Sequence, residues 1–381
     1  MVGASAPPAG RPQPKVMAFV LPQFHRIPEN DRWWGEGFTE WTNVRKATPL
    51  YPGHLQPRVP AEGRYYDMLD PAAHDWQAAL AQQHGLYGFC YYHYWFAGRQ
   101  LLEKPLEMLL ERGKPDMPFC LSWANESWTR AWDGGDREVL MAQDYGDSAD
   151  WARHFDYLLT AFRDPRYVRV DGKPVFLIYR SASIAVRAEM LALWRQLAQR
   201  AGLPGLHVVS MLTGFDVDPR PELFDAFAEF EPMYTIRYGL PYWHRKREKW
   251  INRFNRAAWR VAGRAFQPLQ SYDYGSLWRA AAARPLPARH YGGAFLDWDN
   301  SPRRGLERSL IMRGFDRAAF SAGLHSQLRK AAATGSEFVF VNAWNEWAEG
   351  SYFEPDTARG TFFLDTLRAA TSAIKRPGTA E

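Results

Sequence analysis

The sequence has little cysteine and no long apolar run. Its two cysteines, Cys90 and Cys120, each lie in an apolar stretch of the 381 residues. Two such residues do not make a disulfide framework, so we expect buried thiols. No apolar run approaches the ~18 residues that a membrane-spanning helix needs. The Pro- and Ala-rich start also lacks the hydrophobic core of a signal peptide, so we expect a soluble, cytoplasmic protein.

The motifs of several enzyme classes are also missing. No HxH or HExxH spacing occurs, and His25, His93 and Asp299 stand singly, which argues against a catalytic metal. There is no GxSxG for a serine nucleophile and no glycine-rich phosphate loop after the first apolar segment. Asp297 and Asp299 match the DxD motif of nucleotide-sugar transferases, but so short a motif is weak evidence. The intervening Trp298 is equally consistent with an aromatic platform on which a sugar ring stacks. We therefore predict no metal and no cofactor.

Excess positive charge is confined to one segment. The net charge is +5, yet nine Lys and Arg and a single acid, Glu248, lie from Arg237 to Arg264. The rest of the chain is slightly acidic, so the sequence does not predict a nucleic-acid-binding protein. Residues 245–264 have the spacing of a basic amphipathic helix, which could contact an anionic membrane or an acidic partner. A lid helix packed on the domain is the alternative.

Aromatic side chains are abundant. They make up 15% of the chain, which has 17 Trp. The indole N–H of a buried Trp must find a partner, so a hydrophobic core seldom uses so many. Several Trp neighbour Asn, Asp, Glu or Arg, as in residues 123–126 and 298–300. Aromatic faces beside planar polar groups suit the apolar face and hydroxyl rim of a pyranose, so we expect an oligo- or polysaccharide ligand.

Eight short apolar segments alternate with helical patterns. Such alternation predicts a parallel sheet with right-handed crossovers, and eight units close into a (β/α)8 TIM barrel. A doubly wound open sheet is the alternative. The expected strands are residues 16–22, 88–95, 118–124, 174–180, 206–212, 226–232, 292–298 and 338–344. The expected helices are residues 71–84, 101–112, 148–162, 184–201 and 316–334.

The pattern predicts a single catalytic domain over residues 15–370. Residues 1–14 and 371–381 are expected to be tails. A long first loop, residues 24–70, is rich in Trp, Pro and Gly and is expected to fold over the barrel mouth. Residues 233–290 form an insertion between the sixth and seventh strands that contains the basic helix.

Polar and aromatic residues gather at the carboxyl ends of the expected strands. In barrels this face carries the active site, which is the strongest argument from the residues for an enzyme. A satisfied core histidine is the alternative for His93, and a structural salt bridge is the alternative for Glu126 and Glu231. The expected substrate-binding residues are Gln23, His25, Trp34, Trp41, His93, Tyr94, Trp95, Trp123, Asn125, Glu126, Trp128, Glu231, Trp298, Asp299, Asn345 and Trp347.

The most informative feature is a pair of glutamates, Glu346 and Glu349, directly after the last expected strand. Charge at the edge of an apolar core is costly unless it is partnered, so the pair requires an explanation. One explanation is a structural role, in which a Glu at a helix N-terminus is stabilised by the helix dipole. Catalysis is the other, because retaining glycosidases use two carboxyl groups ~5–5.5 Å apart, and burial and mutual repulsion raise their pKa values. We predict that both are catalytic.

Five motifs carry a resemblance to a known group: LPQFHRIPENDRWWGEGFTEWTN, GFCYYHYWF, PFCLSWANESWTR, WDNSPRR and NAWNEWAEGSYFEP. Over residues 15–367 the chain resembles the WbsX-like proteins of bacterial polysaccharide loci, which are distantly related to glycoside hydrolase family 99. The resemblance implies a metal-independent, retaining, endo-acting α-mannosidase or mannanase on a (β/α)8 barrel. It implies that Glu346 deprotonates the sugar 2-hydroxyl to give a 1,2-anhydro intermediate, and that Glu349 is the general acid. In a double displacement, one Glu would instead be the nucleophile.

These observations together predict a retaining, endo-acting glycoside hydrolase or transglycosylase that acts on an α-linked bacterial glycan. One alternative is a glycosyltransferase of O-antigen or capsule assembly, which would need a nucleotide-sugar or lipid-linked donor. The other is a non-catalytic glycan-binding barrel, which would show no turnover.

Overall fold

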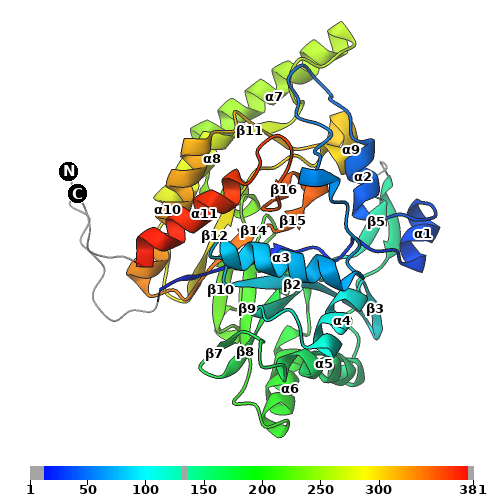
Figure 1. Ribbon diagram of the computed structural model, residues 1–381, viewed down its shortest axis with the longest axis vertical. Helices are drawn as coiled ribbons and strands as arrows, with labels where there is room; N and C mark the ends of the chain where they lie inside the picture. The colour runs from blue at the N-terminus through cyan, green and yellow to red at the C-terminus, as the bar shows by residue number, and fades with distance from the viewer. Residues whose placement is uncertain (1–12, 131–134, 376–381) are drawn as a thin grey trace.

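Eight parallel strands close into a barrel at the centre of the molecule (Figure 1). The structure, a computed structural model, describes residues 13–130 and 135–375. Met17 of the first strand lies opposite both Gly88 of the second and Phe340 of the last, so the sheet closes on itself. This confirms the predicted (β/α)8 TIM barrel and excludes the open sheet. In order around the barrel, the strands are β1 (Lys15–Val20), β2 (Gly88–Phe96), β4 (Phe119–Trp123), β8 (Lys173–Ile178), β9 (His207–Leu212), β10 (Ala226–Glu229), β12 (His290–Phe295) and β14 (Phe338–Asn342).

Helices between the strands cover the outside of the barrel (Figure 1). The predicted helix over residues 101–112 begins later, because Arg99–Leu101 forms strand β3, antiparallel to the end of β2. The helix expected from residue 184 also begins later, after the 3-10 turn η2 (Ser181–Ser183). The outer helices are α3 (Pro71–Gln83), α4 (Lys104–Arg112), α5 (Ser148–Phe162), α6 (Arg187–Arg200), α8 (Tyr274–Ala283), α10 (Arg317–Thr334) and α11 (Phe362–Lys375).

The barrel strands are buried on both faces, as parallel strands flanked by helices are. Every residue of β4, β9 and β14 is buried. Phe19 contacts Phe340 on the neighbouring strand and Phe230 across the barrel, with ring centroids 5.6 and 5.3 Å apart. Cys90 and Cys120 are buried free thiols, as expected. The interior is therefore a packed core, and ligands can enter only at the ends of the strands.

The loops between the barrel strands and the outer helices carry short elements of their own. The first loop lies at the carboxyl ends of the strands, as predicted, since Ala61 N–H donates to Pro355 C=O and Thr357 N–H to Val59 C=O, both at 2.9 Å. The loop elements are α1 (Pro28–Trp34), α2 (Glu40–Lys46), η1 (Ala61–Gly63), β5 (Trp128–Arg130), β6 (Gly135–Met141), β7 (Arg169–Val170), η3 (Pro221–Leu223), α9 (Ser301–Arg308), β13 (Ile311–Arg313), β15 (Asn345–Glu346), η5 (Trp347–Glu349) and β16 (Ser351–Tyr352).

Residues 233–290 interrupt the alternation between β10 and β12, at the place expected for the insertion. They begin with a π turn, η4 (Thr235–Gly239), and continue into α7 (Tyr242–Ala262), β11 (Ser271–Asp273) and α8. The predicted basic helix is α7, which extends past the barrel at the top of Figure 1. Strand β11 pairs in parallel with β13, and α7 rests against this pair.

The two ends of the expected domain differ in what the structure describes. The predicted N-terminal tail lies outside the described residues, except for residues 13 and 14. At the other end α11 continues through residues 371–375, which were expected to begin the C-terminal tail, because Leu367, Ala370 and Ile374 still pack on the domain. Within the described parts of the chain, no helix is long and apolar enough to cross a membrane.

Candidate active site

The chain after β14 makes a tight turn that positions Glu346 and Glu349. Strands β15 and β16 pair antiparallel around the short helix η5. The turn ends at Gly350, whose φ of +69° favours glycine. A Cβ on this residue would lie 3.0 Å from the guanidinium carbon of Arg58 and 3.1 Å from the backbone nitrogen of Asp299. The turn therefore needs glycine both for its conformation and for space.

Buried contacts hold the turn from behind. The ring of Trp347 stacks on Tyr352 with centroids 3.7 Å apart, and its indole N–H donates to Glu354 at 2.6 Å. Glu354 also accepts hydrogen bonds from Tyr66 at 2.9 Å and Gln77 at 2.8 Å. The predicted substrate-binding residue Trp347 thus supports the turn and does not line the cavity that holds Glu346 and Glu349.

One guanidinium, that of Arg303 on α9, contacts three carboxylates. Its Nη2 donates to Glu346 at 2.8 Å, its Nη1 to Glu349 at 2.6 Å and its Nε to Glu40 at 2.8 Å. Neighbouring N–H groups of a rigid, permanently charged fork thus hold the two candidate catalytic carboxylates side by side. The first, seventh and eighth βα loops meet at this point.

Burial raises the pKa of both carboxyl groups of the pair. The pKa of Glu346 rises to about 8, because burial and then the charge on Glu349 outweigh the opposing Arg303 guanidinium. The pKa of Glu349 is raised by burial, with Arg303 opposing and Glu40 adding to the effect. Coupled carboxyl groups titrate together, so we expect the pair to hold one proton between them near neutral pH.

The pair lies in the wall of a cavity of about 670 Å³ at the carboxyl ends of the strands. Aromatic and charged side chains both line this cavity, the combination expected of a sugar site. Among the described residues, no group of three His, Cys, Asp or Glu side chains is placed to hold a metal ion. The predicted site residues that line the cavity are Gln23, Trp34, Tyr94, Glu126, Trp128, Trp298, Glu346 and Glu349.

The histidine and tryptophan of β2 lie behind the cavity wall. Nε2 of His93 is 2.8 Å from Nε2 of His154, and Trp95 stacks on the His154 ring with centroids 4.5 Å apart. Burial lowers the pKa of His93 to about 3, so the ring stays neutral. This is the arrangement of a satisfied core histidine, the alternative considered for His93.

Two further predicted tryptophans use their indole N–H within the protein. Trp41 donates to the C=O of Tyr66 at 2.8 Å, and Trp123 donates to the C=O of Trp95 at 3.3 Å. Both side chains are buried and neither lines the cavity. They support the wall from outside the cavity.

His25 and Asn345 also bond to backbone groups of their own surroundings. Nδ1 of His25 contacts the C=O of Pro22 at 2.9 Å. The amide of Asn345 accepts from the N–H of Leu21 at 2.8 Å and donates to its C=O at 3.0 Å. Asn345 therefore ties the turn after β14 to the end of β1.

Glu126 and Glu231 occupy different places. Glu126 lines the cavity and forms a salt bridge with Arg180 at 3.1 Å, while Asn125 accepts from the Arg180 backbone N–H at 2.8 Å. Glu231 is buried away from the cavity and pairs with Arg284. Only Glu126 is placed to touch a ligand in the cavity.

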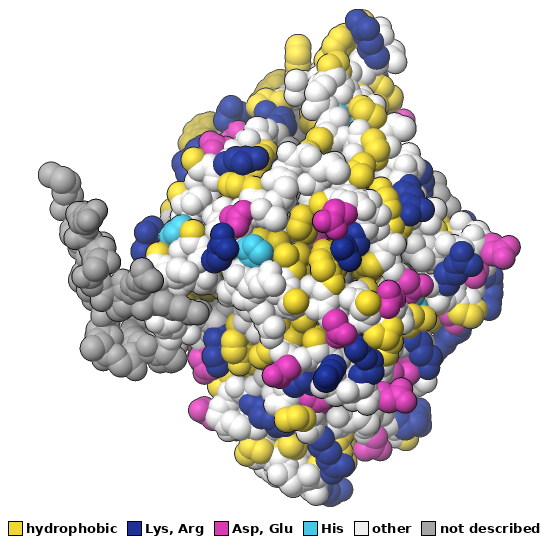
Figure 2. All heavy atoms as spheres, in the orientation of Figure 1, with side chains coloured by type: hydrophobic (Ala, Val, Ile, Leu, Met, Phe, Trp, Pro, Cys, Tyr) yellow, Lys and Arg dark blue, Asp and Glu magenta, His cyan; other side chains and the backbone are white. Residues whose placement is uncertain are grey.

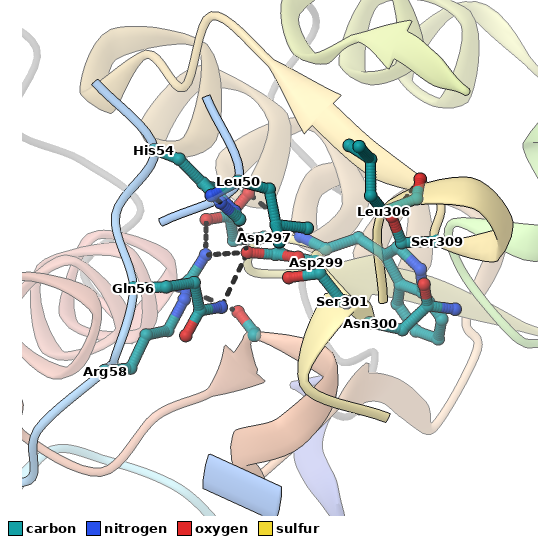
Figure 3. A network of polar contacts seen from close by, with 12 residues as sticks. Leu50, His54, Gln56, Arg58, Asp297, Asp299, Asn300, Ser301, Leu306 and Ser309 are labelled. Carbon is teal, nitrogen blue, oxygen red and sulfur yellow. Dashed lines mark hydrogen bonds and ion pairs between the residues drawn. The ribbon is translucent and has the colours of Figure 1, made fainter. Parts of the chain in front are cut away.

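Asp299 takes part in a buried polar network that Figure 3 shows from close by. Its Oδ2 contacts His54 Nε2 at 2.8 Å and accepts from Gln56 Nε2 at 2.7 Å, and Asp297 pairs with Arg58 at 2.9 Å. The three partners belong to the first loop and point toward the two aspartates (Figure 3). The two aspartates of the DxD motif thus bind the first loop to the end of β12.

Sequence reasoning did not single out several residues of this region as site residues. Arg303 and Glu40 surround the carboxylate pair, and Tyr92 and Tyr179 line the cavity. Arg303 lies in the WDNSPRR motif, which was a usable signal. The two tyrosines carried no such signal, because the neighbouring sequence does not distinguish a tyrosine that lines a cavity from one in the core.

Comparisons with known proteins place the chain in a family. Residues 16–367 match the family model described as Glycosyltransferase WbsX. Two relatives from Xanthomonas campestris pv. campestris, each described as uncharacterized protein WxcX, are 38% and 37% identical over 359 and 363 residues. The alignments cover 93% of this chain and 49% of the relatives, so the chain spans about half the length of the curated relatives it matches.

Solved structures share the barrel. A glycoside hydrolase-like protein has a TM-score of 0.57 at 13% identity, covering 97% of both chains. The family 99 endo-α-mannosidase of Bacteroides thetaiotaomicron has TM-scores of 0.55 and 0.54 in two structures at 14% identity, covering 94% of this chain and 97% of its own. At such identities the likeness shows the fold alone. The sequence match carries the assignment, and the chain belongs to the glycosyltransferase WbsX family.

Proposed function

We propose that this protein is an enzyme that cleaves or transfers a glycosidic bond with retention of configuration, using Glu346 and Glu349. One observation carries the proposal: both carboxylates contact a single guanidinium at the wall of an aromatic-lined cavity. Partners of neighbouring N–H groups on one guanidinium cannot lie far apart. This fits the short separation, about 5–5.5 Å, that retaining glycosidases use.

The cavity wall supports a saccharide as the substrate. Two buried donors in it, Gln23 Nε2 and Trp298 Nε1, have no hydrogen-bond partner within the described residues. Buried polar groups are seldom left so, and the ring hydroxyls of a bound sugar would satisfy them. The likeness to an endo-α-mannosidase supports an α-linked, manno-configured glycan that is cut within its chain.

The chemistry proceeds in two steps. Glu346 takes the proton of the sugar 2-hydroxyl, whose oxygen attacks C1 while the bond from C1 to the leaving oxygen breaks and Glu349 protonates that oxygen. Water, or a second sugar, then gives its proton to Glu349 and attacks C1, and Glu346 returns its proton to O2. Two inversions at C1 give retention. In a double displacement, Glu346 would attack C1 itself.

The first step needs the shared proton on Glu349. Glu346 is the more buried carboxyl, with 7% of its side chain exposed against 21% for Glu349, so burial favours its neutral form in the empty cavity. A 2-hydroxyl that donates to Glu346 would stabilise its charged form, as the Arg303 guanidinium already does. Substrate binding thereby moves the proton to Glu349, the more exposed group and the one that must reach the leaving oxygen.

A glycosyltransferase reaction is the second candidate, and the description of the family favours it. The same carboxylate pair would serve if a sugar hydroxyl replaced water in the second step. A transferase that uses an activated donor would form product only when a nucleotide-sugar or lipid-linked sugar is supplied. A hydrolase would release reducing ends from a polysaccharide alone.

The test is substitution of the pair. Glu346→Gln and Glu349→Gln are each expected to lower turnover by about 10²–10⁴-fold, the usual contribution of a general acid or base, while folding and glycan binding persist. Turnover is measured as reducing ends released from a panel of bacterial polysaccharides, with the anomer of the first product followed by NMR. Glu126→Gln is the matched control, because this third cavity carboxylate pairs with Arg180 and should keep turnover within about tenfold.

Near-wild-type turnover in either the Glu346→Gln or the Glu349→Gln variant would contradict the assignment of the pair as catalytic. An inverted first product would exclude the retaining mechanism. Product that forms only with an added sugar donor would select the transferase. Glycan affinity without turnover in the wild-type protein would select a binding barrel.

A further inference from the structure

The helix α7 turns its apolar side chains away from the protein. Trp243, Trp250, Phe254 and Val261 are 74%, 68%, 72% and 89% exposed. Their spacings of seven, four and seven residues place them in one stripe along the helix. A helix on a protein surface normally turns such a stripe inward, toward the core.

Polar contacts on the opposite face fix this orientation. Glu248, the buried residue of the helix, pairs with Arg313 on β13. The amide of Asn252 accepts from the N–H of Ser271 at 3.0 Å and donates to its C=O at 3.2 Å. Rotating the apolar stripe inward would break the Glu248–Arg313 ion pair and both of these hydrogen bonds. The fold therefore holds the apolar stripe in its exposed position.

Basic side chains border the stripe. The helix contains seven Lys and Arg and one Glu, a net charge of +6 against +5 for the whole chain. Its residues are all described, and its single acid is the buried Glu248, so its solvent face carries only positive charge. The guanidinium of Arg253 lies 5.9 Å from the ring centroid of Trp250. Figure 2 shows hydrophobic and basic side chains together on the projection at the top of the molecule.

We propose that α7 docks the protein on an anionic lipid bilayer and lies in the plane of the interface. An apolar stripe flanked by Lys and Arg is the pattern of interfacial helices, and Trp prefers the headgroup level. Anionic headgroups would neutralise the basic border. A second copy of the chain fits this face less well, because pairing about a two-fold axis would bring basic borders together.

Docking would bring the cavity close to the lipid surface. Strand β11, on which α7 rests, follows directly after Gln270, and Leu310 directly precedes its partner strand β13. Both residues line the cavity. A glycan carried on the membrane would then have a short path to Glu346 and Glu349. This consequence rests on the proposed function, whereas the docking itself does not.

The test measures co-sedimentation with vesicles of phosphatidylcholine that contain about 30% phosphatidylglycerol. The wild-type protein is expected to bind them more tightly than pure phosphatidylcholine vesicles, and salt should weaken the binding by screening. A Lys249→Ala/Arg253→Ala/Arg256→Ala/Arg260→Ala variant should lose on the order of 10²–10³-fold in partition coefficient, since each basic residue near the surface contributes about fivefold.

The control variant removes four exposed basic residues elsewhere, Lys114→Ala/Arg163→Ala/Arg200→Ala/Arg329→Ala, and should bind nearly as well as the wild type. A Trp250→Ser/Phe254→Ser variant should lose about tenfold or more even where salt has screened the charges, because it removes the apolar anchor. Far-UV circular dichroism checks that each variant is folded.

Failure of the wild type to bind anionic vesicles at low salt would overturn the proposal, as would equal losses in the α7 and control variants. A dimer that forms without vesicles and disappears in the Trp250→Ser/Phe254→Ser variant would replace the membrane with a second copy of the chain. Sedimentation velocity detects it. None of these readouts depends on glycosidase activity, so the proposed function can fail without affecting this result.

Discussion

At the scale of single residues, Arg303 controls the electrostatics of the candidate site. Its guanidinium lowers the pKa values of Glu346 and Glu349, while burial raises them. A pair that must hold one proton needs both influences, because burial alone would protonate both carboxyls and the guanidinium alone would ionise both. Arg303 is therefore a positioning residue in the proposed reaction.

We expect Arg303→Gln to shift the pH profile of the proposed activity to higher pH. The proposed reaction requires one ionised and one protonated carboxyl, and loss of the guanidinium raises both pKa values, so both limbs of the bell-shaped pH profile move to higher pH. The free energy of unfolding should also fall by about 3–5 kcal/mol, because three carboxylates lose a buried partner. The measurement is kcat/KM against pH, with Arg303→Lys as a charge-preserving variant.

Arg304→Gln is the control for this shift. Arg304 also lines the cavity and lowers the pKa of Glu349 by its charge, but more weakly than Arg303 does. Its loss should move the profile less. Equal shifts in the two Gln variants would show that the effect comes from net charge in the cavity and not from the direct contacts of Arg303.

At the scale of elements, a close approach of α10 to α8 holds this side of the barrel. Trp278 of α8 stacks on Phe295 of β12 with centroids 4.3 Å apart. Gly323 of α10 also lies against that indole, where an added Cβ would lie 2.1 Å from the nearest ring atom. The glycine is there for space, since a bulkier residue would push the two helices apart.

We expect Gly323→Ala to lower the free energy of unfolding by about 1–3 kcal/mol, the usual effect of overpacking, although alanine favours helix by about 1 kcal/mol. Urea denaturation measures the change. Gly275→Ala in α8 is the matched control, because its Cβ would meet the far end of the Arg279 side chain at 3.1 Å, which can move. That variant should be neutral or slightly stabilised. A Gly323→Ala protein as stable as the wild type would contradict the packing argument.

At the scale of the whole molecule, the network around Asp299 joins parts of the chain that are far apart. His54 and Gln56 reach it across 245 and 243 residues of sequence. Hydrogen bonds from His54 and the charges of Arg58 and His54 lower the pKa of Asp299 to about 2, against the opposing effect of burial. These contacts with the first loop thus favour the ionised form of Asp299.

This linkage predicts acid sensitivity. A carboxyl whose pKa is lower in the folded state stabilises the protein above its unfolded pKa of 3.8, and the contribution disappears as the pH falls toward 2. Asp299→Asn should lower the free energy of unfolding by about 2 kcal/mol or more at neutral pH, and the difference from wild type should shrink between pH ~4 and ~2. Urea denaturation at several pH values measures it.

The control for Asp299→Asn is Asp216→Asn, at a side chain that is 91% exposed. It should change the free energy of unfolding by less than about 0.5 kcal/mol at any pH. A difference between wild type and Asp299→Asn that stays constant from neutral to acid pH would show that hydrogen bonding, and not charge, holds the loop.

The barrel was predictable because each strand is a short apolar run that ends in polar residues, and because the helices between them have a clear period. The starts of α4 and α6 were not predictable from the sequence. The hairpin of β2 with β3 and the turn η2 occupy residues that the helical pattern alone would include.

Part of the candidate site was predictable for a similar reason. The position of Glu346 and Glu349 follows from the strand before them. The direction of a side chain at a strand end does not follow so simply: Tyr92 and Tyr94 line the cavity, whereas His93 between them faces His154. Successive side chains of a strand point to opposite faces. Residues that look equivalent in the sequence can therefore either line the cavity or support its wall from behind.

By itself, the sequence determined the order of strands and helices, the polar residues at the carboxyl ends and the basic helix, because local periodicity and composition govern these. Only the tertiary structure decided that Arg303 joins Glu40, Glu346 and Glu349, and that the apolar stripe of α7 faces outward. The contacts of Arg303 join residues that are 43, 46 and 263 positions away in the sequence, and closure of the barrel is what brings them within hydrogen-bond distance.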